Sequence, residues 1–126
     1  MQYLFYDTCT LLNELDNIFD KPFYISNLTL RELEHIKTSA RKDEDVKYKA
    51  RKVLRLLQDH ADMVTIINYD DRWDKYFKKY PILTDNMDSR IILTALLLAK
   101  KHSLIFITQD ACCAQIAHAL GLAVQQ

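Results

Sequence analysis

The stretch QYLFYDTCTLLNELDNIF, residues 2–19, joins a short apolar run to a helical pattern. Residues 2–6 form an apolar, aromatic run that is typical of a strand buried in a sheet. Thr8 is then the expected cap of a helix. Apolar residues recur after it at helical spacing: Leu11, Leu12, Leu15, Ile18 and Phe19. The chain therefore starts with a strand that leads directly into a helix, and Asp7 stands at the junction.

The same alternation continues along the chain. Further strands are predicted at residues 23–25, 63–67, 104–107 and 122–124, and helices at 29–36, 46–57, 71–79, 85–101 and 111–120. Gly121, the only glycine, stands just past the last helix, where glycine commonly ends helices. Strands that alternate with helices predict a three-layer, Rossmann-like α/β/α fold with a five-stranded parallel sheet.

Composition agrees with one globular domain over residues 1–126. Apolar residues make up 49% of the chain, enough for a core, while one glycine and two prolines exclude collagen-like and low-complexity chains and disfavour a β-sandwich. Seventeen basic and 17 acidic residues cancel, so any nucleic-acid binding must be local.

The sequence favours a cytoplasmic protein that does not enter the membrane. The three cysteines are an odd number without metal-ligand spacing, which indicates reduced thiols. Asp7 interrupts the first apolar run, so we expect no signal peptide. The longest apolar stretch, residues 91–99, is shorter than the roughly 20 residues that span a bilayer.

Four carboxylates occupy strand ends or helix starts of this predicted fold. Asp7 follows the first strand, and Glu32 lies in the first turn of the next helix. Asp88 lies in the first turn of the long helix predicted at residues 85–101, and Asp110 follows the fourth strand. Because ligands bind at the carboxyl edge of open α/β sheets, we expect these side chains to converge in one cleft.

Each acid also has an ordinary structural explanation. A carboxylate near a helix N-terminus contributes about 0.3–1 kcal/mol, and Glu32 would pair with Thr29 in a capping box. Two carboxylates about 4 Å apart, however, repel by roughly 4 kcal/mol at an effective dielectric of 20. A cluster would therefore need a cation, or would hold a proton on one member. Oxygen ligands select Mg²⁺, Mn²⁺ or Ca²⁺, and carboxylate-held Mg²⁺ is usual where phosphodiesters are cleaved.

Four short motifs surround these acids: YDTCTLL at residues 6–12, TLRELEHIK at 29–37, DSRIILTA at 88–95 and TQD at 108–110. Their order and spacing resemble those of the PIN-domain family of metal-dependent ribonucleases over essentially the full chain. The third motif is nearest to the form found in PhoH-type PIN domains. Gly121 matches the family's Leu-Gly ending.

The resemblance implies a PIN-like fold and hydrolysis of RNA with one or two Mg²⁺ or Mn²⁺ ions. The implied metal ligands are Asp7, Glu32, Asp88 and Asp110. Glu32 would bind directly or through water and orient the attacking water, while Thr8 and Thr108 would orient carboxylates by hydrogen bonds. Two roles stay open: RNA processing, or the toxin of a toxin–antitoxin pair, as in VapC-like proteins, with an antitoxin as partner. The alternative is a non-catalytic RNA- or protein-binding module, which predicts the loss of one or more acids.

Two positions need separate comment. Cys9 replaces the usual Asn of the first motif, which leaves substrate preference open. Asp85 competes with Asp88, but Ile91 and Ala95 follow Asp88 at the family's offsets, so we expect Asp85 to cap the helix.

Two surface features have alternative explanations. The candidate RNA contacts are Lys37, Arg41, Arg51 and Arg55. They form either a strip that contacts phosphates or the solvated face of an amphipathic helix. Residues 91–99 are apolar nearly all round, so their helix is either deeply buried or meets a second subunit. Together with the family resemblance, this favours a homodimer.

Overall fold

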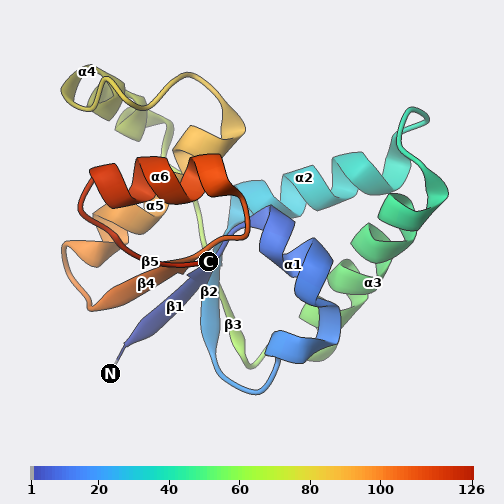
Figure 1. Ribbon diagram of the computed structural model, residues 1–126. Coiled ribbons are helices and arrows are strands. Elements are labelled where there is room, and N and C mark those ends of the chain that lie inside the picture. Colours follow the sequence, from blue (N-terminus) through green and yellow to red (C-terminus); the bar gives the residue numbers. More distant parts are fainter. Residues whose placement is uncertain (1) are drawn as a thin grey trace.

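A computed structural model describes residues 2–126 and shows a parallel sheet between two layers of helices (Figure 1). The strands are β1 (Tyr3–Tyr6), β2 (Phe23–Ser26), β3 (Val64–Ile67), β4 (Leu104–Ile107) and β5 (Ala123–Gln125). The helices are α1 (Thr8–Glu14), α2 (Asn27–Thr38), α3 (Glu44–Asp59), α4 (Tyr76–Lys79), α5 (Met87–Ala99) and α6 (Ala111–Ala119), with 3₁₀ helices η1 (Leu15–Ile18) and η2 (Asp71–Lys75). The strand order is β3-β2-β1-β4-β5, which confirms the predicted three-layer α/β/α fold.

The strand register aligns the ends at which the predicted site lies. All neighbouring strands are parallel. β1 and β4 pair along their whole length, and Tyr6 at the end of β1 lies opposite Ile107 at the end of β4. The strands consequently end at one edge of the sheet, where Asp7 and residues 108–110 follow them.

Successive side chains of each central strand enter different cores, as the pleat requires. Phe5 and Phe106 are completely buried on the face covered by α5 and α6, with ring centroids 6.1 Å apart. Tyr6 and Ile107 belong to the second core, which α1, α2 and α3 cover (Figure 1). Both faces of the central strands are therefore apolar, which explains their uninterrupted hydrophobic sequences.

Helix α5 is buried almost all round within its own chain. No side chain from Ile91 to Leu96 is more than 8% exposed. Trp73 and Phe77, from η2 and α4, pack against the same core as α5 and α6. Deep burial thus accounts for the apolar run, and the homodimer stays a prediction that rests on the family resemblance. Within residues 2–126, no helix combines the length and hydropathy needed to cross a membrane.

Three helix starts differ from expectation. Asp7, rather than Thr8, caps α1. Ser26 caps α2 through a 3.0 Å hydrogen bond from the Leu28 N–H, so Glu32 lies in the second turn and forms no capping box. The cap of α5 is likewise Asn86 rather than Asp85. These corrections matter because they remove the capping explanation for Glu32.

The helix end at Gly121 follows the prediction. Its backbone has φ +89°, in the region that side chains other than glycine rarely adopt. The chain then turns back into β5 at the edge of the sheet.

Candidate metal centre

Asp7 is a buried carboxylate, 6% exposed, directly after β1. Its Oδ1 accepts hydrogen bonds from the Thr10 backbone N–H at 3.0 Å and the Thr10 hydroxyl at 2.6 Å. Its Oδ2 accepts one from the Thr108 hydroxyl. Because each carboxylate oxygen offers about two lone pairs, one on Oδ2 stays available to an outside ligand.

The two threonine hydroxyls also connect Asp7 to the loop after β4. Thr10 Oγ1 accepts from the Gln109 N–H at 3.0 Å, and Thr108 Oγ1 accepts from the Asp110 N–H at 3.1 Å. Asp110 in turn caps α6, since its Oδ1 accepts from the Cys113 N–H at 2.9 Å. The positions of Asp7 and Asp110 are therefore fixed by one hydrogen-bonded network.

Glu32 is half-buried and points to the same edge through Thr8. The Thr8 hydroxyl donates to Glu32 Oε1 at 2.6 Å and lies 3.1 Å from the Thr29 hydroxyl. Burial raises the pKa of Glu32, the Thr8 hydrogen bond lowers it, and the charges of Asp88 and Asp7 raise it further. The predicted orienting role of Thr8 thus has a definite partner, Glu32.

Asp88 lies in the first turn of α5 and is exposed to solvent. Desolvation, followed by the charges of Asp110 and Asp7, raises the pKa of its carboxyl. Asp88 also acts on Glu32, so all four predicted acids share one electrostatic neighbourhood. Neither Glu32 nor Asp88 caps a helix, whereas Asp7 and Asp110 both do.

The donor set fits a hard divalent cation, although its ligands are not already closed around one point. Among residues 2–126, no three His, Cys, Asp or Glu side chains form a ready-made metal site. The four acids also form no ion pair with any described basic residue. All donors are carboxylate oxygens, the ligands that Mg²⁺ and Mn²⁺ prefer, and Asp7 keeps an unused lone pair.

The candidate RNA contacts lie on α2, on α3 and in the turn between them. Lys37 pairs with Glu34 at 3.0 Å, and Arg41 is exposed in the turn between α2 and α3. Arg51 and Arg55 alone share a hollow, of about 230 Å³, on the exposed face of α3. Tyr48 and Lys52 complete its lining.

The sequence interpretation missed Thr10, whose hydroxyl and N–H both hold Asp7. A local signal existed, because Thr10 is the third helical residue after the cap, the position that reaches back to an N-cap side chain. Two cysteines also lie near the acids. Burial and then the carboxylates raise the pKa of the Cys9 and Cys113 thiols, so both stay protonated at neutral pH.

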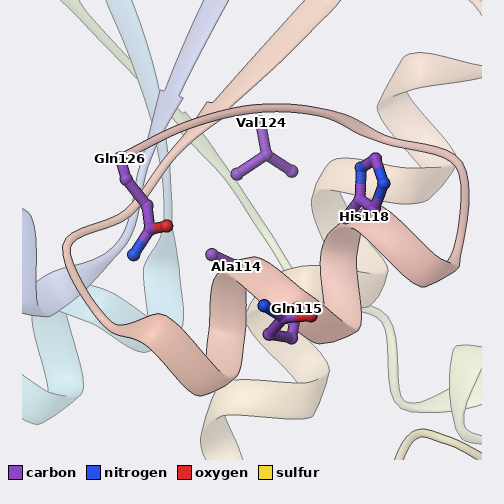
Figure 2. Close-up of a pocket in the computed structure, with 5 residues that line it drawn as sticks. All are labelled: Ala114, Gln115, His118, Val124 and Gln126. Carbon is purple, nitrogen blue, oxygen red and sulfur yellow. The ribbon is translucent and has the colours of Figure 1, made fainter.

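A separate hollow of about 200 Å³ lies between α6 and the C-terminal residues (Figure 2). Its lining residues are Ala114, Gln115, His118, Val124 and Gln126. None of the four predicted acids contributes to it, so it is not part of the candidate metal centre.

Comparisons with known proteins agree with this fold. A family model described as the PIN domain matches residues 4–126. The structure is similar to a member of the VapBC family of toxin–antitoxin systems, VapBC-5 from Mycobacterium tuberculosis. The TM-score is 0.67 at 22% identity, covering 99% of this chain and 98% of that one. VapBC2 from Rickettsia felis, solved with a DNA fragment from its promoter, gives 0.61 at 15% identity, covering 99% and 98%.

A domain of a functionally unknown protein from Methanocaldococcus jannaschii is also similar. Its TM-score is 0.66 at 20% identity, covering 99% of this chain and 90% of that one. A sequence search of curated proteins gave no match.

Proposed function

Because the chain belongs to the PIN-domain family, we propose that it is a ribonuclease that hydrolyses RNA phosphodiester bonds with Mg²⁺ or Mn²⁺. The observation that carries this proposal is a group of four carboxylates that influence one another's charge without a basic partner among the described residues. Like charges brought together in this way cost stability, and a bound cation offsets the cost.

The proposed ligands are Asp7, Glu32, Asp88 and Asp110. When bound, the metal lowers the pKa of a water molecule and neutralises charge on the phosphate. Asp7 is held rigidly by Thr10 and Thr108, so its available lone pair has a fixed direction. Glu32 accepts from Thr8 through Oε1, and its other oxygen can accept a proton from water and orient it toward the phosphate.

A binding module without catalysis is the competing function. Such a module has no need for Glu32 and Asp88, whose carboxyl pKa values are raised by burial and by the charges of neighbouring acids. Glu32 is the most informative of them, because neither capping nor an ion pair within residues 2–126 explains it. We therefore favour the nuclease.

Cleavage of labelled single-stranded RNA tests this proposal, with Mn²⁺, Mg²⁺ or EDTA and with wild type beside Asp7→Asn. We expect metal-dependent cleavage by wild type and none by the variant. Asparagine keeps the Oδ1 acceptor for Thr10, and thermal unfolding should show that the variant still folds. Equal cleavage by both proteins would contradict the proposal. So would a calorimetric titration in which the wild-type protein bound no Mn²⁺.

Within this function, we propose the role of toxin in a toxin–antitoxin pair, with an antitoxin protein as partner. Its support is the fold shared with VapBC-5, a member of the VapBC family of toxin–antitoxin systems, and with VapBC2. Expressed alone, wild type should arrest growth and Asp7→Asn should not. Growth that is equal for both proteins would favour RNA processing instead.

A further inference from the structure

A hollow of about 510 Å³ adjoins the proposed metal centre on the side of Glu32. It is lined by Arg31, Glu32, His35, Ile36, Lys42 and Met87. Four of these residues come from α2, Lys42 comes from the turn before α3, and Met87 opens α5 one residue before Asp88. The hollow is therefore next to the carboxylates of Glu32 and Asp88. Its volume lies within the range of roughly 300–1,000 Å³ that is typical of small-ligand sites.

The basic residues of this hollow have no acidic partner. Neither Arg31 nor Lys42 forms an ion pair within residues 2–126, although Glu32 lines the same space. Three of the four lysines of α2 and α3 do pair with acids: Lys37 with Glu34, Lys47 with Glu44 and Lys49 with Asp45. Two cations that remain unpaired beside four acids are suited to an anion that the metal centre alone does not bind.

The remaining lining is apolar or aromatic. Ile36 and Met87 are half-buried, so part of each side chain faces the hollow, and the His35 ring stands exposed at its side. A nucleobase needs such a surface, because it stacks on aromatic or apolar side chains once it leaves the base stack. The hollow thus combines a surface for a base with two cations for a phosphate.

We propose that this hollow binds a nucleotide of single-stranded RNA next to the cleaved bond, an inference that rests on the function proposed above. Arg31 and Lys42 contact its phosphate, and Ile36, Met87 and His35 contact its base. A paired base cannot enter the hollow without leaving its partner, so the site selects unpaired RNA. None of these residues is among the RNA contacts predicted from sequence, which were Lys37, Arg41, Arg51 and Arg55.

The test measures binding of a labelled, mixed-sequence single-stranded RNA by fluorescence anisotropy in EDTA over a range of salt concentrations. The variant is Arg31→Ala/Lys42→Ala. Both residues are exposed, so we expect the variant to fold, and thermal unfolding checks this. We expect about tenfold weaker binding and a salt dependence whose log–log slope falls by about 0.7, the value for one neutralised phosphate on a single strand. Arg31→Lys/Lys42→Arg should restore the slope.

The matched control is Lys78→Ala/Lys79→Ala, which removes two exposed charges on α4 and should leave the affinity and slope near wild type. Unchanged binding by the Arg31/Lys42 variant, an equal loss in the control, or no binding by wild type would overturn the proposal. An equal loss of affinity for duplex RNA would overturn it too, since the hollow is argued to take an unpaired base. If the Arg31/Lys42 variant kept its RNA binding but lost affinity for an acidic peptide, the hollow would be assigned to a protein partner instead.

Failure of this proposal can be told from failure of the nuclease. The KM for Mn²⁺-dependent cleavage of the same RNA separates the two. If Arg31→Ala/Lys42→Ala left this KM unchanged, the nucleotide site in the hollow would be rejected and the nuclease proposal would stand. If the wild-type protein bound RNA through Arg31 and Lys42 but did not cleave it, the nuclease proposal would be rejected and the hollow would remain a nucleotide site.

Discussion

Two groups of carboxylates in this molecule meet opposite electrostatic conditions. Around Arg90, the guanidinium lies 3.3 Å from Asp74 and 2.5 Å from Asp85, and the Tyr69 hydroxyl donates to Asp74. At the carboxyl edge of the sheet, the acids receive hydroxyl and N–H donors but no cation from the described residues. We call these the Arg90 cluster and the edge cluster.

The two clusters shift carboxyl pKa values in opposite directions. The Tyr69 hydrogen bond and Arg90 lower the pKa of Asp74. Burial and neighbouring acids raise the pKa of Glu32 and Asp88. The Arg90 cluster contains its own cation, whereas the edge cluster carries an electrostatic cost that an external cation would remove.

The largest expected effect separates two aspartates three positions apart. Asp88→Asn should lower Mn²⁺-dependent RNA cleavage by about 10³-fold, roughly 4 kcal/mol of transition-state stabilisation, because it removes a proposed metal ligand. Asp85→Asn makes the same chemical change in the Arg90 cluster and should keep cleavage within about twofold. Rates of RNA cleavage at saturating Mn²⁺ measure both. A loss in Asp85→Asn that equals the loss in Asp88→Asn would mean that the two clusters do not differ in function.

The next effect concerns the group that orients Asp7. Thr108→Val keeps the shape of the side chain but removes the hydroxyl that donates to Asp7 and accepts from the Asp110 N–H. Loss of such a ligand-orienting bond typically costs about 10–100-fold in metal affinity, which calorimetric titration with Mn²⁺ would measure. Thr94→Val is the control, because Thr94 is equally buried and its hydroxyl donates only to the Arg90 carbonyl of its own helix. Unaltered affinity in Thr108→Val would remove the role assigned to this hydroxyl.

A smaller effect is expected on the free energy of unfolding when the ion pairs of the Arg90 cluster are removed. Arg90→Met should lower the free energy of unfolding by about 1 kcal/mol, since solvent screens its pairs with partly exposed acids and its contacts with the Tyr69 and Phe77 rings add little more. Tm should fall by about 4 °C in EDTA and by the same amount with Mn²⁺. A fall that Mn²⁺ abolishes would place Arg90 in the edge cluster.

The smallest effect is a difference in the sign of the pH dependence. The raised pKa of Glu32 means that its contribution to stability is present below the unfolded value near 4.5 and is lost as pH rises through the folded value. The lowered pKa of Asp74 means that its contribution is present above the unfolded value near 3.8 and is lost as pH falls through the folded value. In EDTA at about pH 7, Glu32→Gln should therefore raise Tm and Asp74→Asn should lower it.

Both differences should shrink as the pH is lowered to about 3, where the wild-type carboxyls take up protons. Thermal unfolding followed by circular dichroism at several pH values measures this. Two variants that shift Tm in the same direction at neutral pH would contradict the opposition between the clusters.

Local patterns predicted the strands well and helix starts less well. Leu104–Ile107 was predicted with its observed bounds, because an apolar run buried on both faces is a local signal. Thr29 and Glu32 matched a capping box, but the position of the β2 end places the cap at Ser26. The packing of the sheet, which no local pattern contains, decided that start.

In the candidate site, too, local sequence patterns predicted some features and missed those that depend on packing. Strand ends placed Asp7 and Asp110 at one edge, because parallel strands impose that position. The sequence did not indicate the hollow beside Glu32, since its lining comes from α2, from the turn that holds Lys42 and from the start of α5. Their proximity depends on how α2 and α5 meet at the sheet edge.

The division of the four acids into two that cap helices and two that do not has an evolutionary consequence. Selection for folding alone would retain Asp7 and Asp110, whose carboxylates accept backbone N–H groups. Glu32 and Asp88 cap no helix, and neutralising either relieves repulsion from the neighbouring acids. If the proposed nuclease activity is what retains these two acids, a lineage without that activity would lose them first and keep the other pair. The pattern of surviving acids among relatives would then be a test of the proposed activity.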